Sequence, residues 1–70
     1  MKININSSKL IVYPNYVNVD ELNFLSRTIK NNSLLSYSID NMSRMHIVGN
    51  SSELFRLLYE LSKDFDVELI

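Results

Sequence analysis

The sequence predicts an α+β domain with the ferredoxin-like split β-α-β arrangement, in the order β-α-β-β-α-β. Two amphipathic segments, each preceded by a polar capping residue, predict helices over 19–31 and 51–64. Short apolar or alternating segments flank both helices and predict strands. Two successive right-handed strand–helix–strand units interlock into one antiparallel sheet with both helices on one face. Residues 1–70 are enough for a single small domain with a core of limited size.

The N-terminal region contains two candidate strands. Leu10-Ile11-Val12-Tyr13 precedes the first helix, and Pro14 is expected to end that strand. Residues 2–6 alternate between apolar and polar side chains, so they are a candidate additional strand that residues 6–8 would turn back on 10–13. The sequence leaves open both this addition and the register of the strand at 10–13.

The first helix is predicted over 19–31 by a cap and an apolar stripe. Asn18 and Glu21 have the spacing of a capping box, in which each side chain accepts from the backbone N–H of the other residue. The stripe that should face the core recurs at helical spacing: Val19, Leu22, Leu25 and Ile29. Asn31 is expected to end the helix.

Two strands joined by a short turn are predicted between the helices. Alternation over 34–39 would direct Leu35, Tyr37 and Ile39 to one face, and Met45–Val48 follows as the next strand. Asp40-Asn41 is the expected turn, because both residues tolerate positive φ. Gly49, the single glycine, is expected to supply a permissive backbone before the second helix.

The second helix, over 51–64, repeats the features of the first at an offset of 32 residues. Asn50 and Glu53 again have capping-box spacing. The apolar stripe consists of Leu54, Leu57, Leu58, Leu61 and Phe65. Residues 67–70 are predicted to form the last strand. Whether the repeat reflects duplication or shared folding rules stays open.

Composition narrows the classes of function. The chain has no cysteine and one histidine, which excludes disulfides, thiol catalysis and multi-histidine metal sites. We expect no cofactor and no metal. There is no segment of signal-peptide or membrane-spanning character, so we expect a cytoplasmic protein that does not bind membranes. Abundant Asn, Ser, Ile and Leu suggest AT-rich coding, as in phages and mobile elements.

Few residues suggest catalysis, and we expect a protein that is not an enzyme. Arg44 and His46 share one strand face and could bind a phosphate or carboxylate, but a solvated strand face is the more common explanation. No acidic residue has a spacing that would locally orient His46. Gly49-Asn50-Ser51-Ser52 is far from a phosphate-binding loop, because such a loop needs more glycines and a lysine.

Two surfaces could bind a macromolecule. The sheet face opposite the helices would present Arg44 and His46, with Tyr13 in one of two registers, and this is the basis for a nucleic-acid-binding regulator as the alternative function. The net charge of −1 argues against that reading, because phosphate binding usually requires a basic surface.

The leading hypothesis is a non-enzymatic protein–protein interaction module, such as a small regulator or inhibitor that occupies a partner's surface. A phage or mobile-element protein directed at a host defence protein is one form of it, and a homodimer is expected because the core is small. An uncovered last strand could pair with another chain. The candidate interface residues are Tyr16, Phe24, Tyr59, Glu68 and Ile70.

Overall fold

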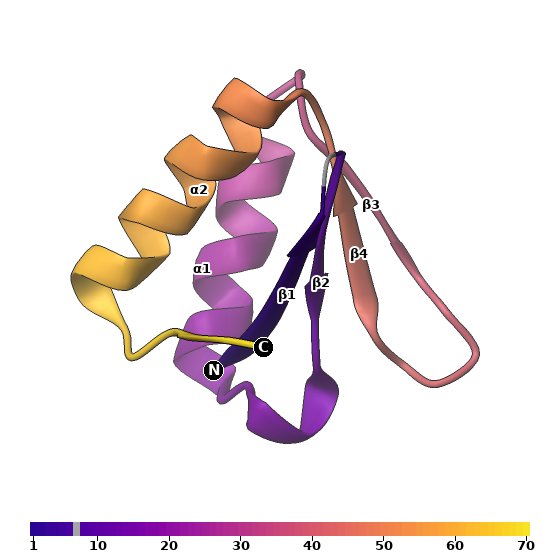
Figure 1. Ribbon diagram of the computed structural model, residues 1–70, viewed down its shortest axis with the longest axis vertical. Helices are drawn as coiled ribbons and strands as arrows, with labels where there is room; N and C mark the ends of the chain where they lie inside the picture. Colours follow the sequence, from indigo (N-terminus) through magenta and orange to yellow (C-terminus); the bar gives the residue numbers. More distant parts are fainter. Residues whose placement is uncertain (7) are drawn as a thin grey trace.

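In the part of the chain that the structure describes, a five-stranded sheet has two helices on one face, and its other face is open (Figure 1). It is seen in a computed structural model that describes residues 1–6 and 8–70. The predicted α+β class is therefore confirmed. In chain order the elements are β1 (Lys2–Asn6), β2 (Lys9–Val12), the 3-10 helix η1 (Pro14–Tyr16), α1 (Val19–Lys30), β3 (Ser36–Ile39), β4 (Met45–Val48), α2 (Ser51–Asp64) and β5 (Glu68–Leu69).

The candidate N-terminal strand joins the sheet, and its position changes the predicted topology. The strand order is β3-β4-β2-β1-β5. The four strands of the two interlocked units keep the expected relative order, but β1 is inserted between β2 and β5. As a result β5 pairs with β1 in parallel, so the sheet is mixed rather than wholly antiparallel. The β1–β2 pairing is local, and it occupies the side of β2 that β5 would otherwise have bound.

Several predicted boundaries shift by one or two residues. The strand predicted at 10–13 is Lys9–Val12, and the strand predicted at 67–70 shortens to Glu68–Leu69. β4 and α2 have the predicted bounds. Pro14 ends the strand region as expected, because it begins the 3-10 turn. Ser7, in the predicted turn between β1 and β2, lies outside the described residues.

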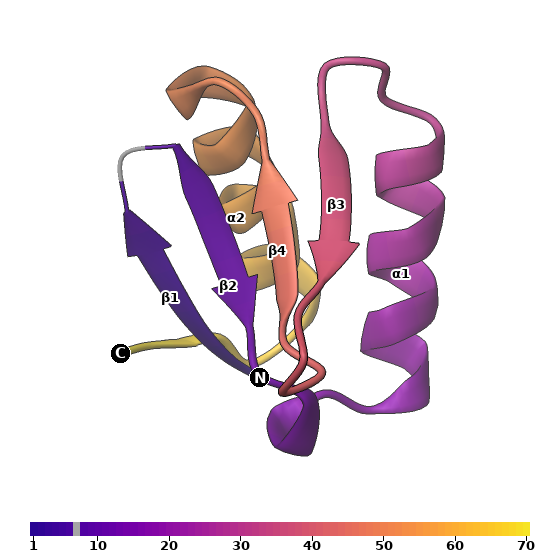
Figure 2. The ribbon, with the colours of Figure 1, turned by 90° about the vertical axis from the view of Figure 1, so that its right-hand side faces the viewer.

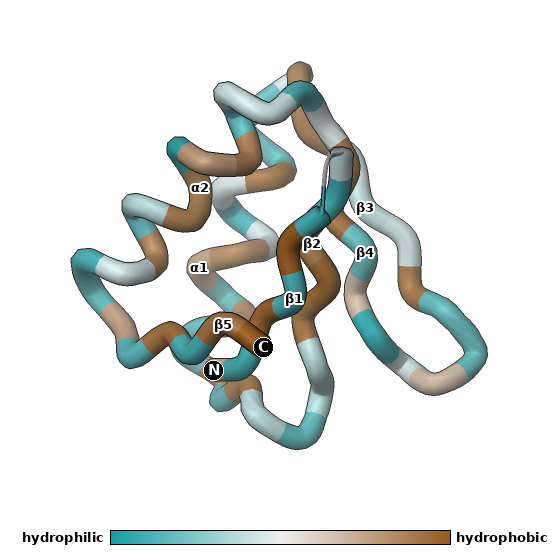
Figure 3. Tube along the Cα trace, in the orientation of Figure 1, coloured by the Kyte–Doolittle hydropathy of each residue, from teal (hydrophilic) through white to brown (hydrophobic). Residues whose placement is uncertain are grey.

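The core lies between the helices and the sheet face that they cover. The sheet contributes Ile3, Leu10, Val12, Met45 and Ile47, all buried. The helices contribute Leu25, Ile29, Leu54, Leu57 and Leu61. In α2, the hydrophobic positions lie on the side nearer the sheet and the hydrophilic positions on the outer side (Figure 3).

The apolar stripe predicted for the first helix is partly wrong. Val19 is 71% exposed and Leu22 is 45% exposed, whereas Glu21 is 5% exposed. Glu21, Leu25 and Ile29 are the buried residues of α1. Leu22 shares a helix face with Leu25 and Ile29, but it lines an open pocket with Ile39 and Met45 and stays exposed. Glu21 tolerates burial because Oε1 accepts a hydrogen bond from the N–H of Asn18, at 2.9 Å.

The two predicted capping boxes differ in the structure. Asn18 and Glu21 form both reciprocal hydrogen bonds, so the first box is complete. At the second helix, Asn50 Oδ1 accepts from the N–H of Glu53, at 2.9 Å. The Glu53 carboxylate instead accepts from Nδ2 of Asn32, at 3.0 Å. This contact ties the start of α2 to the segment between α1 and β3.

Two turn residues act differently from the prediction. Positive φ in the β3–β4 turn occurs at Ser43, with φ of 62°, and not at Asp40 or Asn41. Gly49 does not have positive φ. A Cβ at position 49 would lie 2.7 Å from Cδ2 of Leu35 and 3.0 Å from the carbonyl oxygen of Leu34. Gly49 is therefore required for space rather than for backbone freedom.

Candidate functional site

β3 forms one edge of the sheet, and all four of its residues are exposed. In an antiparallel pair, alternate residues direct both backbone groups toward the partner strand, and the residues between them direct theirs away. The N–H of Asp40 donates to the carbonyl of Arg44, at 3.0 Å, so Ser38, two residues earlier, also faces β4. The N–H and C=O groups of Tyr37 and Ile39 therefore point outward from the sheet.

The side chains of Tyr37 and Ile39 lie on the helix-covered face of the sheet yet stay exposed. They pair with Ile47 and Met45, which are buried, but they are themselves 56% and 53% exposed. The predicted shared face is therefore found, but of the three residues predicted to lie on it only Leu35 is buried. The difference arises because β3 lies at the edge, where the core ends.

An apolar groove lies beside this edge strand. Helix α1 stands beyond β3 when the open face of the sheet is viewed (Figure 2). The groove has a volume of about 230 Å³ and is lined by Val12, Pro14, Val17, Leu22, Ile39, Ser43 and Met45. We call β3 together with this groove the β3 surface. Its residues include no charged side chain.

The chemistry of the β3 surface is that of a strand open to pairing. Natural edge strands are usually protected by Lys, Pro, a bulge or a covering loop. β3 has the sequence Ser-Tyr-Ser-Ile and carries no Lys or Pro. Met42, in the adjoining turn, adds a further side chain that is 65% exposed. The β3 surface therefore combines outward backbone hydrogen-bonding groups with apolar area that can be buried.

Asp40, at the end of β3, holds the β3–β4 turn together. Its Oδ1 accepts from the N–H groups of Met42 and Arg44, at 2.8 and 2.9 Å. Its Oδ2 accepts from Nε of Arg44, at 2.7 Å, and lies 2.8 Å from Nε2 of His46. The hydrogen bond with His46, together with those from Arg44 and Met42, holds the pKa of the Asp40 carboxyl well below its usual range.

This cluster overturns the prediction that no acidic residue orients His46. Asp40 orients His46 from across the turn. It also contacts Arg44, and Arg44 and His46 lie on one face of the sheet, as the sequence predicted. The Asp40 carboxylate pairs with the Arg44 guanidinium and is hydrogen-bonded with the His46 ring, so the cluster has a structural role in fixing the turn next to the β3 surface.

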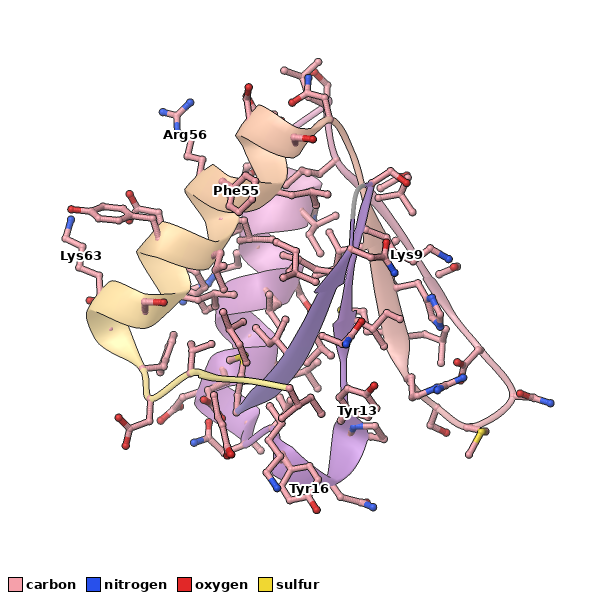
Figure 4. The ribbon with its side chains drawn as sticks, in the orientation of Figure 1. Lys9, Tyr13, Tyr16, Phe55, Arg56 and Lys63 are labelled. Atoms are coloured by element: carbon pink, nitrogen blue, oxygen red, sulfur yellow. The ribbon has the colours of Figure 1, made fainter. Side chains whose placement is uncertain are left out.

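The open sheet face also settles the register of the first predicted strand. Ile11 pairs with His46, so Ile11 and Tyr13 share the open face, and Leu10 and Val12 face the helices. Figure 4 shows Lys9 and Tyr13 on the side of the sheet away from the helices. The observed register is therefore the one of the two possible registers that places Tyr13 on the open face. All three nucleic-acid candidates lie on that face: Tyr13, Arg44 and His46.

The residues predicted to form a protein interface do not form one continuous surface. Tyr16 is 50% exposed and lies under the Lys2 ammonium, 4.2 Å from the ring centroid. Tyr16 and Glu68 line one open hollow beside β5. Ile70 is exposed just beyond β5, where its carbonyl accepts from Nδ2 of Asn4, at 2.8 Å.

The two remaining interface candidates lie on the helices. Phe24 is half-buried and packs edge-on against Phe65, with ring centroids 5.5 Å apart, so much of its ring belongs to the core. Tyr59 is 65% exposed on the outer side of α2, near Lys63. A contact role for these residues stays a prediction.

Comparison with known proteins gives no further direction. The chain matches no protein-family model, no curated protein and no solved structure. Within residues 1–6 and 8–70, no three His, Asp or Glu side chains are grouped so that they could hold a metal ion. No helix in the described part of the chain is long and apolar enough to cross a membrane.

Sequence reasoning missed the β3 surface because it placed Leu22 in the core-facing stripe and did not predict that Tyr37 and Ile39 stay exposed on their face of the sheet. The signal that could have identified the surface is topological. In two interlocked strand–helix–strand units, the strand after the first helix lies at an edge, where core packing is incomplete. The absence of Lys and Pro from 36–39 then marks this edge as open to pairing.

Proposed function

We propose that this chain is a cytoplasmic, non-enzymatic protein-interaction module that binds an extended strand of a partner along β3. The bound strand adds to the sheet through the backbone groups of Tyr37 and Ile39 and places apolar side chains in the adjoining groove. By occupying a segment of its partner in this way, the module would act as a small regulator or inhibitor.

One observation carries the proposal. An entire strand of four residues is exposed at the sheet edge, has no charge, and adjoins an apolar groove. Backbone pairing at such an edge supplies affinity, and the groove supplies selectivity for the side chains of the bound strand. The other edge, β5, pairs over only two residues and has the acidic residues Asp66 and Glu68 within or beside it.

Capture of partners with matched variants tests this proposal. The wild-type chain, Tyr37→Lys and Tyr59→Lys would each be used to purify bound proteins from the native cell. Tyr37 and Tyr59 are 56% and 65% exposed, so the two substitutions make similar changes on different surfaces. We expect Tyr59→Lys to retain the partner and Tyr37→Lys to lose it.

The purified complex gives a second readout. Amide hydrogen exchange should slow at Tyr37 and Ile39 when the partner binds, because their N–H groups become hydrogen-bonded. Retention of the partner by Tyr37→Lys, or slowed exchange only at α2 or β5, would show that the module binds through another surface.

Nucleic-acid binding by the open face is the second candidate, favoured by the register that places Tyr13 beside a face carrying Lys9, Arg44 and His46. Its cations are few, and one of them, the Arg44 guanidinium, is paired with the Asp40 carboxylate. Binding to mixed RNA and DNA oligonucleotides at low salt that is lost in Lys9→Glu, but not in Tyr37→Lys, would favour this function over the first.

A further inference from the structure

We infer that the strand bound by β3 is the β3 strand of a second copy of this chain. The two strands pair antiparallel about a two-fold axis through Ser38, which joins two five-stranded sheets into one continuous sheet. This inference rests on the proposed function, because it names the partner of the same β3 surface.

The hydrogen-bonding pattern of β3 selects this register. The outward backbone groups belong to Tyr37 and Ile39. Centring the axis on Ser38 places Tyr37 of each copy opposite Ile39 of the other, so each of these two pairs exchanges two hydrogen bonds. If the two-fold axis passed through Tyr37 or Ile39 instead, only that residue would lie opposite its own copy, and the other outward residue of β3 would have no partner within the β3 strand of the second copy. The register through Ser38 therefore satisfies all the outward groups of the strand.

The side chains fit the same register on both faces of the sheet. On the helix-covered face, each Tyr37 ring lies beside an Ile39 side chain of the other copy, and aromatic–β-branched pairs stabilise antiparallel strands. On the open face, Ser38 lies opposite itself, and this close non-hydrogen-bonded position accepts a small hydroxyl. Ser36 lies opposite Asp40, whose carboxylate is already bound by Arg44 and His46.

Charge and exposed area also favour a second copy. The four β3 residues are neutral, so two identical edges meet without repulsion. Pairing covers Tyr37 and Ile39, which are more than half exposed in the single chain, and closes one side of the groove that holds Leu22. A standard interface buries roughly 800 Å² on each partner, and a four-residue strand with a groove is smaller. We therefore expect association at micromolar concentrations.

Cysteine pairing tests the register directly, because the natural chain has no cysteine. The register places the two Ser38 residues in a non-hydrogen-bonded pair with Cα atoms about 4.5 Å apart, within disulfide range. Ser38→Cys should form a disulfide-linked dimer under mild oxidation. Ser36→Cys is the matched control, since it is exposed on the same strand face but lies opposite Asp40. We expect it to crosslink at least about tenfold more slowly.

Association of the unmodified chain provides an independent measurement. Light scattering from about 5 to 500 μM should show the mass rising from 8.2 kDa toward twice that value. Tyr37→Lys should shift the midpoint at least about tenfold, and Tyr59→Lys should not. Amide exchange at Tyr37 and Ile39 should slow with concentration, whereas Ser38, already bonded to β4, should change little.

The outcomes separate this inference from the proposed function. Equal crosslinking of Ser36→Cys and Ser38→Cys, or a monomer at every concentration, would overturn the homodimer. If the homodimer is overturned but Tyr37→Lys abolishes capture of another protein, the proposed strand addition at β3 is supported, and the partner is that protein rather than a second copy. If the chain dimerises but Tyr37→Lys does not weaken the dimer, the two copies meet through another surface and this inference is wrong, whereas the proposed function is still decided by the capture experiment.

Discussion

The Asp40 carboxylate lies 2.8 Å from Nε2 of His46, across the turn that joins β3 to β4. The same oxygen accepts from Nε of Arg44, at 2.7 Å. The side chains of Arg44, just before β4, and His46, within it, are thus held by one carboxylate from the other side of the turn. This arrangement fixes the end of the strand whose edge we propose as the binding surface.

Replacing this carboxylate should make the protein less stable in a pH-dependent way. The pKa of Asp40 in the fold lies well below its ordinary value of 3.8. Its ionised form therefore stabilises the fold above about pH 3.8, and this stabilisation is lost as the pH falls below that value toward the pKa in the fold. Asp40→Asn keeps the acceptor for the turn N–H groups but loses the charge.

Urea unfolding at several pH values measures this effect. We expect Asp40→Asn to unfold at lower urea than the wild type at pH 7, with the two midpoints converging as the pH falls below 3.8. Asp64→Asn, at the exposed end of α2, is the control and should keep the wild-type pH profile. A constant gap between wild type and Asp40→Asn at all pH values would contradict the ion-pair explanation.

Removing the cap of the first helix should lower stability. Asn18→Ala removes the acceptor for the N–H of Glu21, whereas the Glu21 carboxylate keeps its hydrogen bond from the backbone N–H of residue 18 and its ion pair with the N-terminal ammonium. We expect a loss of about 1 kcal/mol in the free energy of unfolding, as is typical for helix caps. Asn23→Ala, an exposed substitution within α1, should stay within about 0.5 kcal/mol of wild type in the same denaturation series.

Adding one methyl group at Gly49 should strain the core. The Cβ of Gly49→Ala would lie 2.7 Å from Leu35 and 3.0 Å from the backbone oxygen of Leu34. Leu35 is buried, so it has little room to move away. We expect a loss of about 1–2 kcal/mol by thermal unfolding, compared with a change under about 0.5 kcal/mol for Ser52→Ala. Wild-type stability of Gly49→Ala would mean that this loop adjusts freely.

Truncating Phe24 should separate its core role from a contact role. Because the ring packs edge-on against Phe65, Phe24→Ser should lose about 2 kcal/mol of stability. Phe55→Ser removes a side chain that is 60% exposed and should cost under about 0.5 kcal/mol. If Phe24→Ser instead kept wild-type stability but changed the association of the chain, Phe24 would be an interface residue rather than a core residue.

Local rules account for the part of the fold that sequence reasoning predicted. The helix starts at Asn18 and Asn50 depend on residues three positions apart, and β4 depends on its own apolar run, so each could be read from a short segment. The half-formed second box shows the limit of such rules. Glu53 turns to Asn32, which is distant in sequence, and no local spacing encodes that choice.

The remaining features depend on which strands become neighbours. Leu22 and Tyr37 have the periodicity of core residues, but exposure is decided by the edge position of β3. The contact between Asp40 and His46 depends on the turn geometry, with Ser43 at positive φ. Similarly, either β1 or residues 67–70 could have paired with the free edge of β2. Only the complete sheet shows that β1, through the β1–β2 hairpin, pairs there and that β5 pairs with β1.

The parallel pairing of β1 with β5 has a kinetic consequence. Lys2 and Ile3 pair with Glu68 and Leu69, at the opposite end of the sequence, whereas the β1–β2 and β3–β4 hairpins join near neighbours. Closing a long loop costs more entropy than closing a hairpin, so this contact should form last during folding. Because the β1–β5 pairing spans only two residues, it should also be the first part of the sheet to open in the native state. This opening would transiently remove the strand that covers the buried core residue Ile3 at the sheet edge.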